Sequence, residues 1–82
     1  TVRLYFAEIG FRFPGQRRFN AAINGTQVLF DFDIVAAAGA ANTAVARDFP
    51  AEADANGNIV IAFTNGSRDN AFVNAIQVIA PI

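Results

Sequence analysis

The chain has 82 residues, of which 54% are hydrophobic and 16% charged, and its formal net charge is −1. It contains no histidine and no cysteine, which excludes thiol and histidine catalysis, disulfides and the usual nitrogen and sulfur ligands of zinc. Because the net charge is close to zero and no lysine is present, we expect neither a nucleic acid nor a membrane as partner.

The first predicted strand spans residues 2–9, where β-branched and aromatic residues follow one another with apolar groups on both faces. The next stretch, residues 10–16, contains Gly10, Pro14 and Gly15, which are typical of a loop. Phe11 and Phe13 nevertheless place two large apolar side chains there. A loop with two phenylalanines calls for a functional or packing explanation.

A hairpin is predicted over residues 17–34. Apolar residues alternate with polar ones on both sides of Asn24-Gly25, and this dipeptide accepts the positive φ angles of a type I′ turn. Residues 35–46 are rich in alanine but interrupted by Gly39 and Asn42, so we expect a loop with one helical turn.

The last part of the chain predicts two clear strands and one weaker strand. The weaker strand covers residues 43–49 and ends at Pro50, and a turn follows at residues 54–58. Residues 59–63 alternate as a strand, residues 65–70 form a polar loop, and residues 72–79 form the final strand. Six strands without a convincing helix predict one antiparallel all-β domain over residues 1–82, a β-sandwich or part of one.

Three segments carry a resemblance to a known family. TVRLYFAEI, PGQRRFNAAINGTQVLFDFDIVAAAG and DNAFVNAIQVI occur in the order and spacing of the malectin domain, which they resemble over nearly the whole chain. The resemblance implies a jelly-roll-like β-sandwich and corresponds to the C-terminal half of that domain. The N-terminal half, with further strands and two sugar-stacking tyrosines, has no counterpart here, so we expect a module that is truncated relative to the family.

This resemblance implies a function and a location. It implies a non-catalytic carbohydrate-binding module that recognises a glucan or another plant or bacterial polysaccharide or oligosaccharide, without a cofactor. It also implies a secreted or extracellular protein. The alternative is a structural or protein-interaction β-sandwich whose sugar site has decayed, which the replacement of one family aromatic by Gly10 favours.

The resemblance also suggests site residues. Phe11 matches the second residue of an aromatic pair, and Asp69 matches an aspartate before the last strand, both of which contact a glucose disaccharide in the family. A sugar site also suits these residues physically, since aromatic faces cover pyranose C–H groups while carboxylates and amides bond hydroxyl groups. The complete predicted set is Phe11, Phe13, Asn65, Arg68, Asp69 and Asn70. The alternative is that the phenylalanines cap the sandwich and the polar loop only turns.

The remaining acidic residues allow two interpretations. Asp31 and Asp33 would share one strand face, and Glu8 from a neighbouring strand would complete a glycosidase pair or a calcium site. We favour a solvated strand face or ion pairs with arginine, and therefore predict no enzyme and no metal. Arg12, Arg17 and Arg18 would then pair with acidic residues or line a sugar site.

The apolar excess predicts a partner surface. If the family sandwich needs both halves, this chain has three options: a small closed sandwich, pairing with a second copy, or a missing half supplied by another chain. We favour the homodimer.

Overall fold

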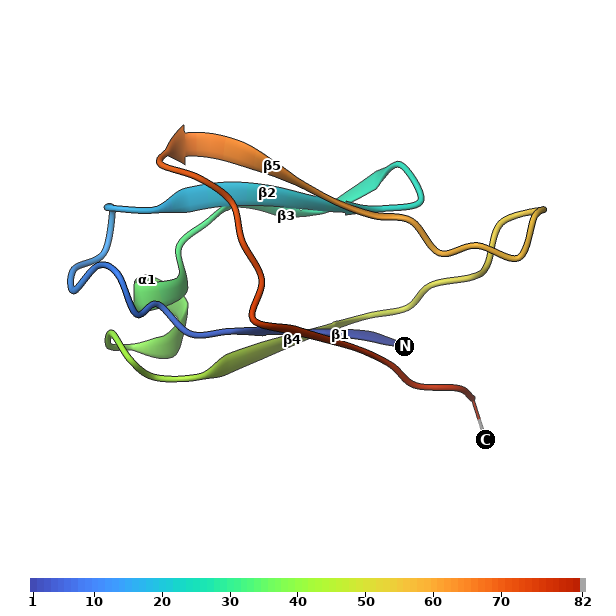
Figure 1. The fold of residues 1–82 in the computed structure, drawn as a ribbon, viewed down its shortest axis with the longest axis horizontal. Coiled ribbons are helices and arrows are strands. Elements are labelled where there is room, and N and C mark those ends of the chain that lie inside the picture. Colours follow the sequence, from blue (N-terminus) through green and yellow to red (C-terminus); the bar gives the residue numbers. More distant parts are fainter. Residues whose placement is uncertain (82) are drawn as a thin grey trace.

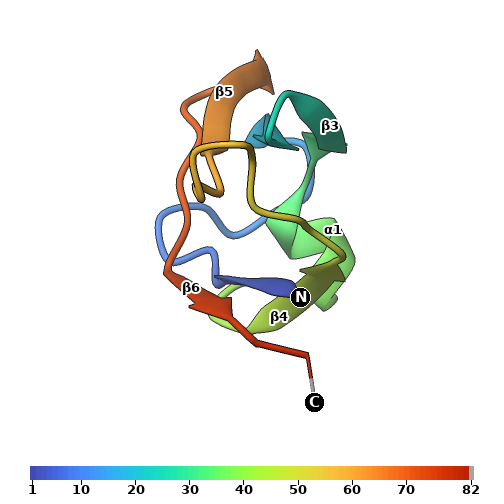
Figure 2. The same ribbon diagram turned by 90° about the vertical axis from the view of Figure 1, so that its right-hand side faces the viewer.

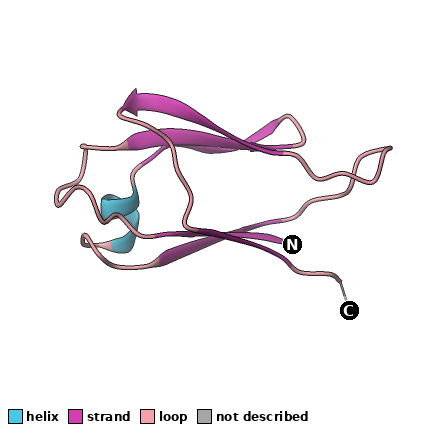
Figure 3. Cartoon of the chain, viewed as in Figure 1, coloured by secondary structure: helices cyan, strands magenta, loops and turns pink. Residues whose placement is uncertain are grey.

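The computed structural model describes residues 1–81, which form six strands and one short helix (Figures 1 and 3). In chain order these are β1 (Val2–Phe6), β2 (Arg18–Ile23), β3 (Thr26–Phe32), α1 (Ile34–Ala38), β4 (Val45–Phe49), β5 (Ile61–Arg68) and β6 (Ala75–Val78).

The strands form two antiparallel sheets that lie face to face. One sheet has the order β4-β1-β6 and the other the order β3-β2-β5. Figure 2 shows them as two layers seen end on. The predicted all-β antiparallel sandwich is therefore confirmed, and the single chain supplies both of its layers.

The core lies between the central strands of the two sheets. Alternate residues of β1 and β2 point inward and are almost fully buried, as the period of two requires: Val2, Leu4, Phe6, Phe19, Ala21 and Ile23. The rings of Phe6, Phe19 and Phe32 meet with centroids 5.2–5.9 Å apart in tilted or edge-on arrangements. Such geometries are the favourable ones for aromatic pairs, so this cluster fixes the distance between the sheets.

The hairpin between β2 and β3 is confirmed. Asn24 has φ 47° and Gly25 has φ 82°, the positive values expected of an Asn-Gly turn. The Asn24 side chain also accepts a hydrogen bond from the Val60 amide at 2.7 Å and donates to the Glu52 carbonyl at 2.7 Å. These bonds attach the turn to the segment that leads into β5.

The predicted helical turn in the alanine-rich segment is also confirmed. Asp33 is the N-cap of α1, and its carboxylate accepts a hydrogen bond from the Ala36 amide at 3.1 Å. Gly39 ends the helix with φ 88°, a left-handed conformation that glycine adopts without strain.

Several predicted boundaries were wrong, among them the starts of β4 at Val45, not residue 43, and of β5 at Ile61, not residue 59. The first strand ends at Phe6, not Ile9, because the Asn74 side chain accepts the Ala7 amide at 2.8 Å in place of a strand partner. The final strand begins at Ala75, and the preceding Phe72 and Val73 pack against the core from the connection.

A further difference concerns the predicted polar loop. Asn65, Gly66, Ser67 and Arg68 belong to β5. Asn65 and Arg68 pair with Phe19 and Arg18 of β2, and the register shift between these two pairs leaves Gly66 and Ser67 without an opposed residue. The Asp31 carboxylate accepts hydrogen bonds from the amide and hydroxyl of Ser67 at 2.8 and 2.9 Å, which holds this irregular end of the strand.

Candidate functional site

One end of the sandwich carries the loop between β1 and β2, residues 10–16, next to α1 (Figure 1). An open pocket of about 290 Å³ lies in this loop, lined by Gly10, Phe11, Arg12, Phe13 and Gln16. The side chain of Phe13 is 67% exposed. The pocket therefore offers an accessible aromatic ring beside an arginine and an amide.

Two hydrogen bonds shape this loop. The Phe13 amide donates to Gln16 Oε1 at 3.0 Å, and the Gly15 amide donates to Asp33 Oδ2 at 2.5 Å. Gly15 has φ 85°, which a residue with a side chain would adopt only with strain. Asp33 thus links the loop to the start of α1.

The base of the loop is fixed by a buried ion pair. The Glu8 side chain is only 2% exposed, and its Oε1 accepts a hydrogen bond from Arg17 Nε at 2.6 Å. Its Oε2 accepts the Gly10 amide at 3.1 Å. A buried carboxylate needs a compensating cation and hydrogen bonds, and Glu8 has both.

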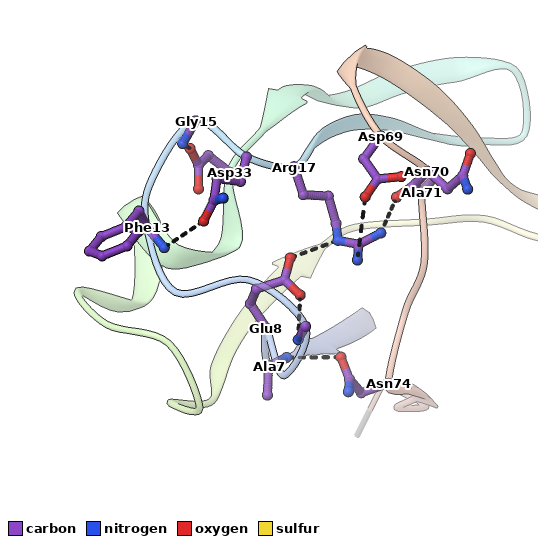
Figure 4. Close-up of polar contacts among 12 residues, drawn as sticks. Ala7, Glu8, Phe13, Gly15, Arg17, Asp33, Asp69, Asn70, Ala71 and Asn74 are labelled. Carbon is purple, nitrogen blue, oxygen red and sulfur yellow. Dashed lines mark hydrogen bonds and ion pairs between the residues drawn. The ribbon is translucent and has the colours of Figure 1, made fainter.

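Arg17 connects this loop with the segment that follows β5. Its Nη1 donates to the Asn70 carbonyl at 2.7 Å, and its Nη2 lies 4.0 Å from Asp69 Oδ2 (Figure 4). The guanidinium carbon lies 5.1 Å from the ring centre of Phe11 and 4.6 Å from that of Phe72. Arg17 is thus held by charge, hydrogen bonds and two aromatic rings at once.

The segment after β5 has its own internal bonds. Asn65 Nδ2 donates to Asn70 Oδ1 at 3.1 Å, and the Ala71 amide donates to Asn65 Oδ1 at 2.8 Å. Asp69 has φ 52°, which marks the sharp change of direction after the strand. The polar residues of this segment are therefore arranged by one another and by Arg17.

The structure thus brings most of the predicted site residues together. Phe11, Asn65, Asp69 and Asn70 lie in one group of contacts around Arg17, and Phe13 lines the same pocket as Phe11. Arg68 is different: it lies at the end of β5, opposite Arg18 in the register, and is exposed.

Sequence reasoning placed Arg17 only among three arginines of open role and did not identify it as the centre of this group. A signal for it was present. Glu8 follows the buried positions Leu4 and Phe6 at a spacing of two, and Arg17 precedes the buried Phe19 at the same spacing. Both charged side chains therefore fall on the inward faces of opposite sheets, where they meet.

The carboxylates of Asp31 and Asp33 have structural partners. Asp31 Oδ2 lies 3.6 Å from Arg18 Nη1, and Asp33 Oδ2 lies 3.8 Å from Arg18 Nε, in agreement with the favoured ion pairs. The hydrogen bonds from Ser67 hold the pKa of Asp31 below its ordinary value. The expected shared strand face was wrong, because β3 ends at Phe32 and Asp33 is the helix cap.

Comparison with known protein families matches residues 1–76 to the family described as the malectin domain. The chain belongs to the malectin domain family. Malectin domains are a carbohydrate-binding, non-catalytic family and are typically extracellular. Comparisons with curated proteins and with solved structures give no match.

No group of three or more acidic residues that could hold a metal ion is found within residues 1–81. Across the same residues, no helix has the length and apolar character needed to cross a membrane.

Proposed function

We propose that this malectin domain binds a glucose-containing oligosaccharide or polysaccharide at the end of the sandwich formed by residues 10–16 and 69–71, outside the cell and without catalysis. The observation that carries the proposal is the open pocket of about 290 Å³ with the 67% exposed ring of Phe13, adjacent to the polar group around Arg17. The pocket is close to the lower limit of ligand sites, which suits one or two sugar rings.

The two phenylalanines have different roles in this proposal. Arg17 lies over the ring of Phe11, so that aromatic face already has a partner. Phe13 makes its ring available to solvent, and the C–H face of a pyranose would stack on it. Phe13 is therefore the main stacking residue, and Phe11 forms the wall of the pocket and holds Arg17.

The sugar hydroxyl groups would bond to the polar rim. Asp69 is 4.0 Å from Arg17, a distance that leaves its carboxylate able to accept hydrogen bonds from a ligand. Asn70 uses its backbone carbonyl and Oδ1 internally, which directs its Nδ2 group to a ligand acceptor. Arg12 also lines the pocket, and Asn65 orients Asn70 through its hydrogen bond to Oδ1. Arg68 lies at the end of β5, outside this group of contacts.

The test is binding to a panel of glucans and xylans, measured by affinity gel electrophoresis and by titration calorimetry. Phe13→Ala and Asp69→Ala are each expected to weaken binding tenfold or more, which corresponds to about 1.4 kcal/mol. Phe30→Ala is the matched control, since Phe30 is 70% exposed but lies on β3, outside the site.

Two results would overturn the proposal. If no polysaccharide or oligosaccharide of the panel is retained by the unmodified chain, the domain is a structural or interaction module. If binding occurs and Phe13→Ala leaves it unchanged while Phe30→Ala abolishes it, the ligand binds on the β3 side instead.

We also infer that two copies of the chain associate. Large apolar side chains remain exposed after both sheets have formed, among them Ile76 and Val78 of β6. Light scattering at micromolar concentration is expected to give a dimer mass, and a monomer mass together with cooperative unfolding would contradict the association.

A further inference from the structure

The polar side chains that line the pocket offer hydrogen-bond donors to a ligand. Among the lining residues, Arg12 and Gln16 have polar side chains. The guanidinium of an arginine has five N–H donors and no acceptor. Gln16 Oε1 accepts the Phe13 amide at 3.0 Å, so the acceptor of this side chain is engaged within the loop and its Nε2 donors are left for a ligand. A ligand that fits these side chains therefore supplies acceptors.

The guanidinium of Arg12 has no acidic partner within residues 1–81. The ion pairs formed there involve the arginines at positions 3, 17 and 18. Arg12 is exposed, and none of the residues that line the pocket is acidic. The pocket therefore carries a positive charge that is not paired with a carboxylate of the described chain.

The carboxylates next to this loop have other arginines as partners. Glu8 Oε1 is bonded to Arg17 Nε at 2.6 Å. Asp33 Oδ2 lies 3.8 Å from Arg18 Nε, and Asp69 Oδ2 lies 4.0 Å from Arg17 Nη2. The charge in the pocket is thus left for a ligand.

We propose that the pocket binds an acidic sugar, a glucose unit oxidised at C6 to the carboxylate, which contacts Arg12 and Gln16. This inference rests on the sugar binding proposed above and names the chemical class of the sugar. A carboxylate has acceptors only, and its two oxygens match the planar fork of a guanidinium. The C6 hydroxymethyl group of unmodified glucose has no charge and one oxygen, so it fits these donors less well.

An oxidised glucose unit also suits the exposed ring of Phe13. The C–H face of the sugar would stack on this ring, as in the site proposed above. The C6 carboxylate projects from the rim of the sugar ring, so stacking leaves it free to reach a group beside the aromatic ring. Arg12 and Phe13 line the same pocket, and one sugar unit is therefore able to contact both.

The charge of the whole chain does not favour acidic ligands. The formal net charge of the 82 residues is −1, and no lysine is present. A negatively charged polysaccharide is thus not attracted to the chain as a whole. A preference for an acidic sugar would have to come from a local contact, and it should depend on Arg12.

The experiment compares each glucan of the panel that has free C6 hydroxyl groups with the same glucan after oxidation of those groups to carboxylates. Linkage and chain are kept, and only the C6 substituent changes. By titration calorimetry, the natural chain is expected to bind the oxidised form at least tenfold more tightly, because hydrogen bonds between charged groups are the stronger ones. The difference should shrink as sodium chloride is added, since salt screens an exposed charge pair.

Three variants locate the contact. Arg12→Gln is expected to remove the preference, so that both forms bind with similar affinity. Arg12→Lys keeps the charge without the planar fork and should retain part of the preference. Arg3→Gln is the matched control: it removes one positive charge from a partly exposed arginine that pairs with Asp48 of β4, outside the pocket, and should keep the preference.

The outcomes separate this inference from the proposed sugar binding. If neither the panel nor its oxidised forms bind, both proposals are overturned. Equal binding of the two forms keeps the sugar binding and overturns the acidic sugar. A preference that survives in Arg12→Gln, or that Arg3→Gln removes as well, overturns the contact with Arg12. A sulfated form of the same glucan that binds as tightly as the oxidised form overturns the assignment to a carboxylate.

Discussion

Replacement of Arg17 by methionine tests whether the ion pair at the end of the core holds the two sheets together. Methionine has a similar length and keeps apolar contact with the rings of Phe11 and Phe72, but removes the positive charge. Glu8, 2% exposed, would then keep the Gly10 amide as a partner but lose its cation. The carboxylate would be left buried without a compensating positive charge.

The expected magnitude follows from that burial. Removal of one partner of a buried ion pair destabilises a protein by about 3–5 kcal/mol. The hydrogen bond from Arg17 to the Asn70 carbonyl is lost in the same step, and a bond to a charged donor contributes about 1.5–3 kcal/mol. The two values describe one side chain and do not add fully. A loss of about 3–5 kcal/mol is still a large part of the 5–15 kcal/mol typical of a whole domain.

The assay is equilibrium unfolding in urea of four proteins: the natural chain, Arg17→Met, Glu8→Gln and the double variant. Glu8→Gln keeps one acceptor oxygen, enough for Arg17 Nε or the Gly10 amide but not for both. It leaves no buried anion, and Arg17, 17% exposed, still lies 4.0 Å from Asp69, so this variant should cost less than Arg17→Met. In the double variant no charge is buried, and we expect about 2 kcal/mol or more of the Arg17→Met loss to be recovered. Losses that simply add, within about 0.5 kcal/mol, would refute charge compensation as the source of the stability.

Two further predictions concern β5 and its contact with β3. Gly66→Ala should destabilise the domain by about 1–3 kcal/mol in urea unfolding, because the added Cβ would lie 2.6 Å from the backbone carbonyl oxygen of Arg18. Gly10→Ala is the control: its Cβ would meet nothing closer than 3.5 Å, so stability should change by less than about 0.5 kcal/mol. The pKa of Asp31 is lowered in the folded chain by Ser67, so the folded state binds fewer protons than the unfolded state and stability falls as the pH drops below about 4. Asp31→Asn should therefore flatten this acid-induced loss in urea midpoints measured from pH 7 to pH 2. An unchanged profile for this variant would contradict the assignment.

The regular parts of the fold follow from local pattern. The apolar run of residues 2–9 predicted β1, alternation predicted the two hairpin strands and Asn24-Gly25 predicted their turn, because these signals depend only on residues near in sequence. In the structure the buried residues alternate through Leu4 and Phe6 of β1 and start at Phe19 in β2. Continuing the same alternation by one step at each strand end reaches Glu8 and Arg17. The alternation therefore assigns both residues to the inward face. Because charged side chains are seldom buried, the sequence alone did not indicate that they form a buried ion pair.

The end of β5 could not be predicted in the same way. Asn65-Gly66-Ser67 has the composition of a turn, but pairing with β2 and the Asp31 carboxylate, 36 residues away from Ser67, hold it in the sheet. Gly66 is required there for close approach to its neighbours, not for a positive φ. Because the outcome depends on such a distant contact, the local sequence does not distinguish a turn from a strand here.

A substitution of Arg17 is expected to change both sugar binding and stability. Arg17 touches Phe11 of the pocket loop and bonds the Asn70 carbonyl, so a change that displaces it would move both sides of the proposed sugar site and reduce stability together. Phe13 is the more selective probe, because a 67% exposed ring contributes little to the core. If Phe13→Ala lowers sugar affinity at unchanged urea midpoint while Arg17→Met lowers both, Phe13 contacts the ligand and Arg17 positions the residues that do.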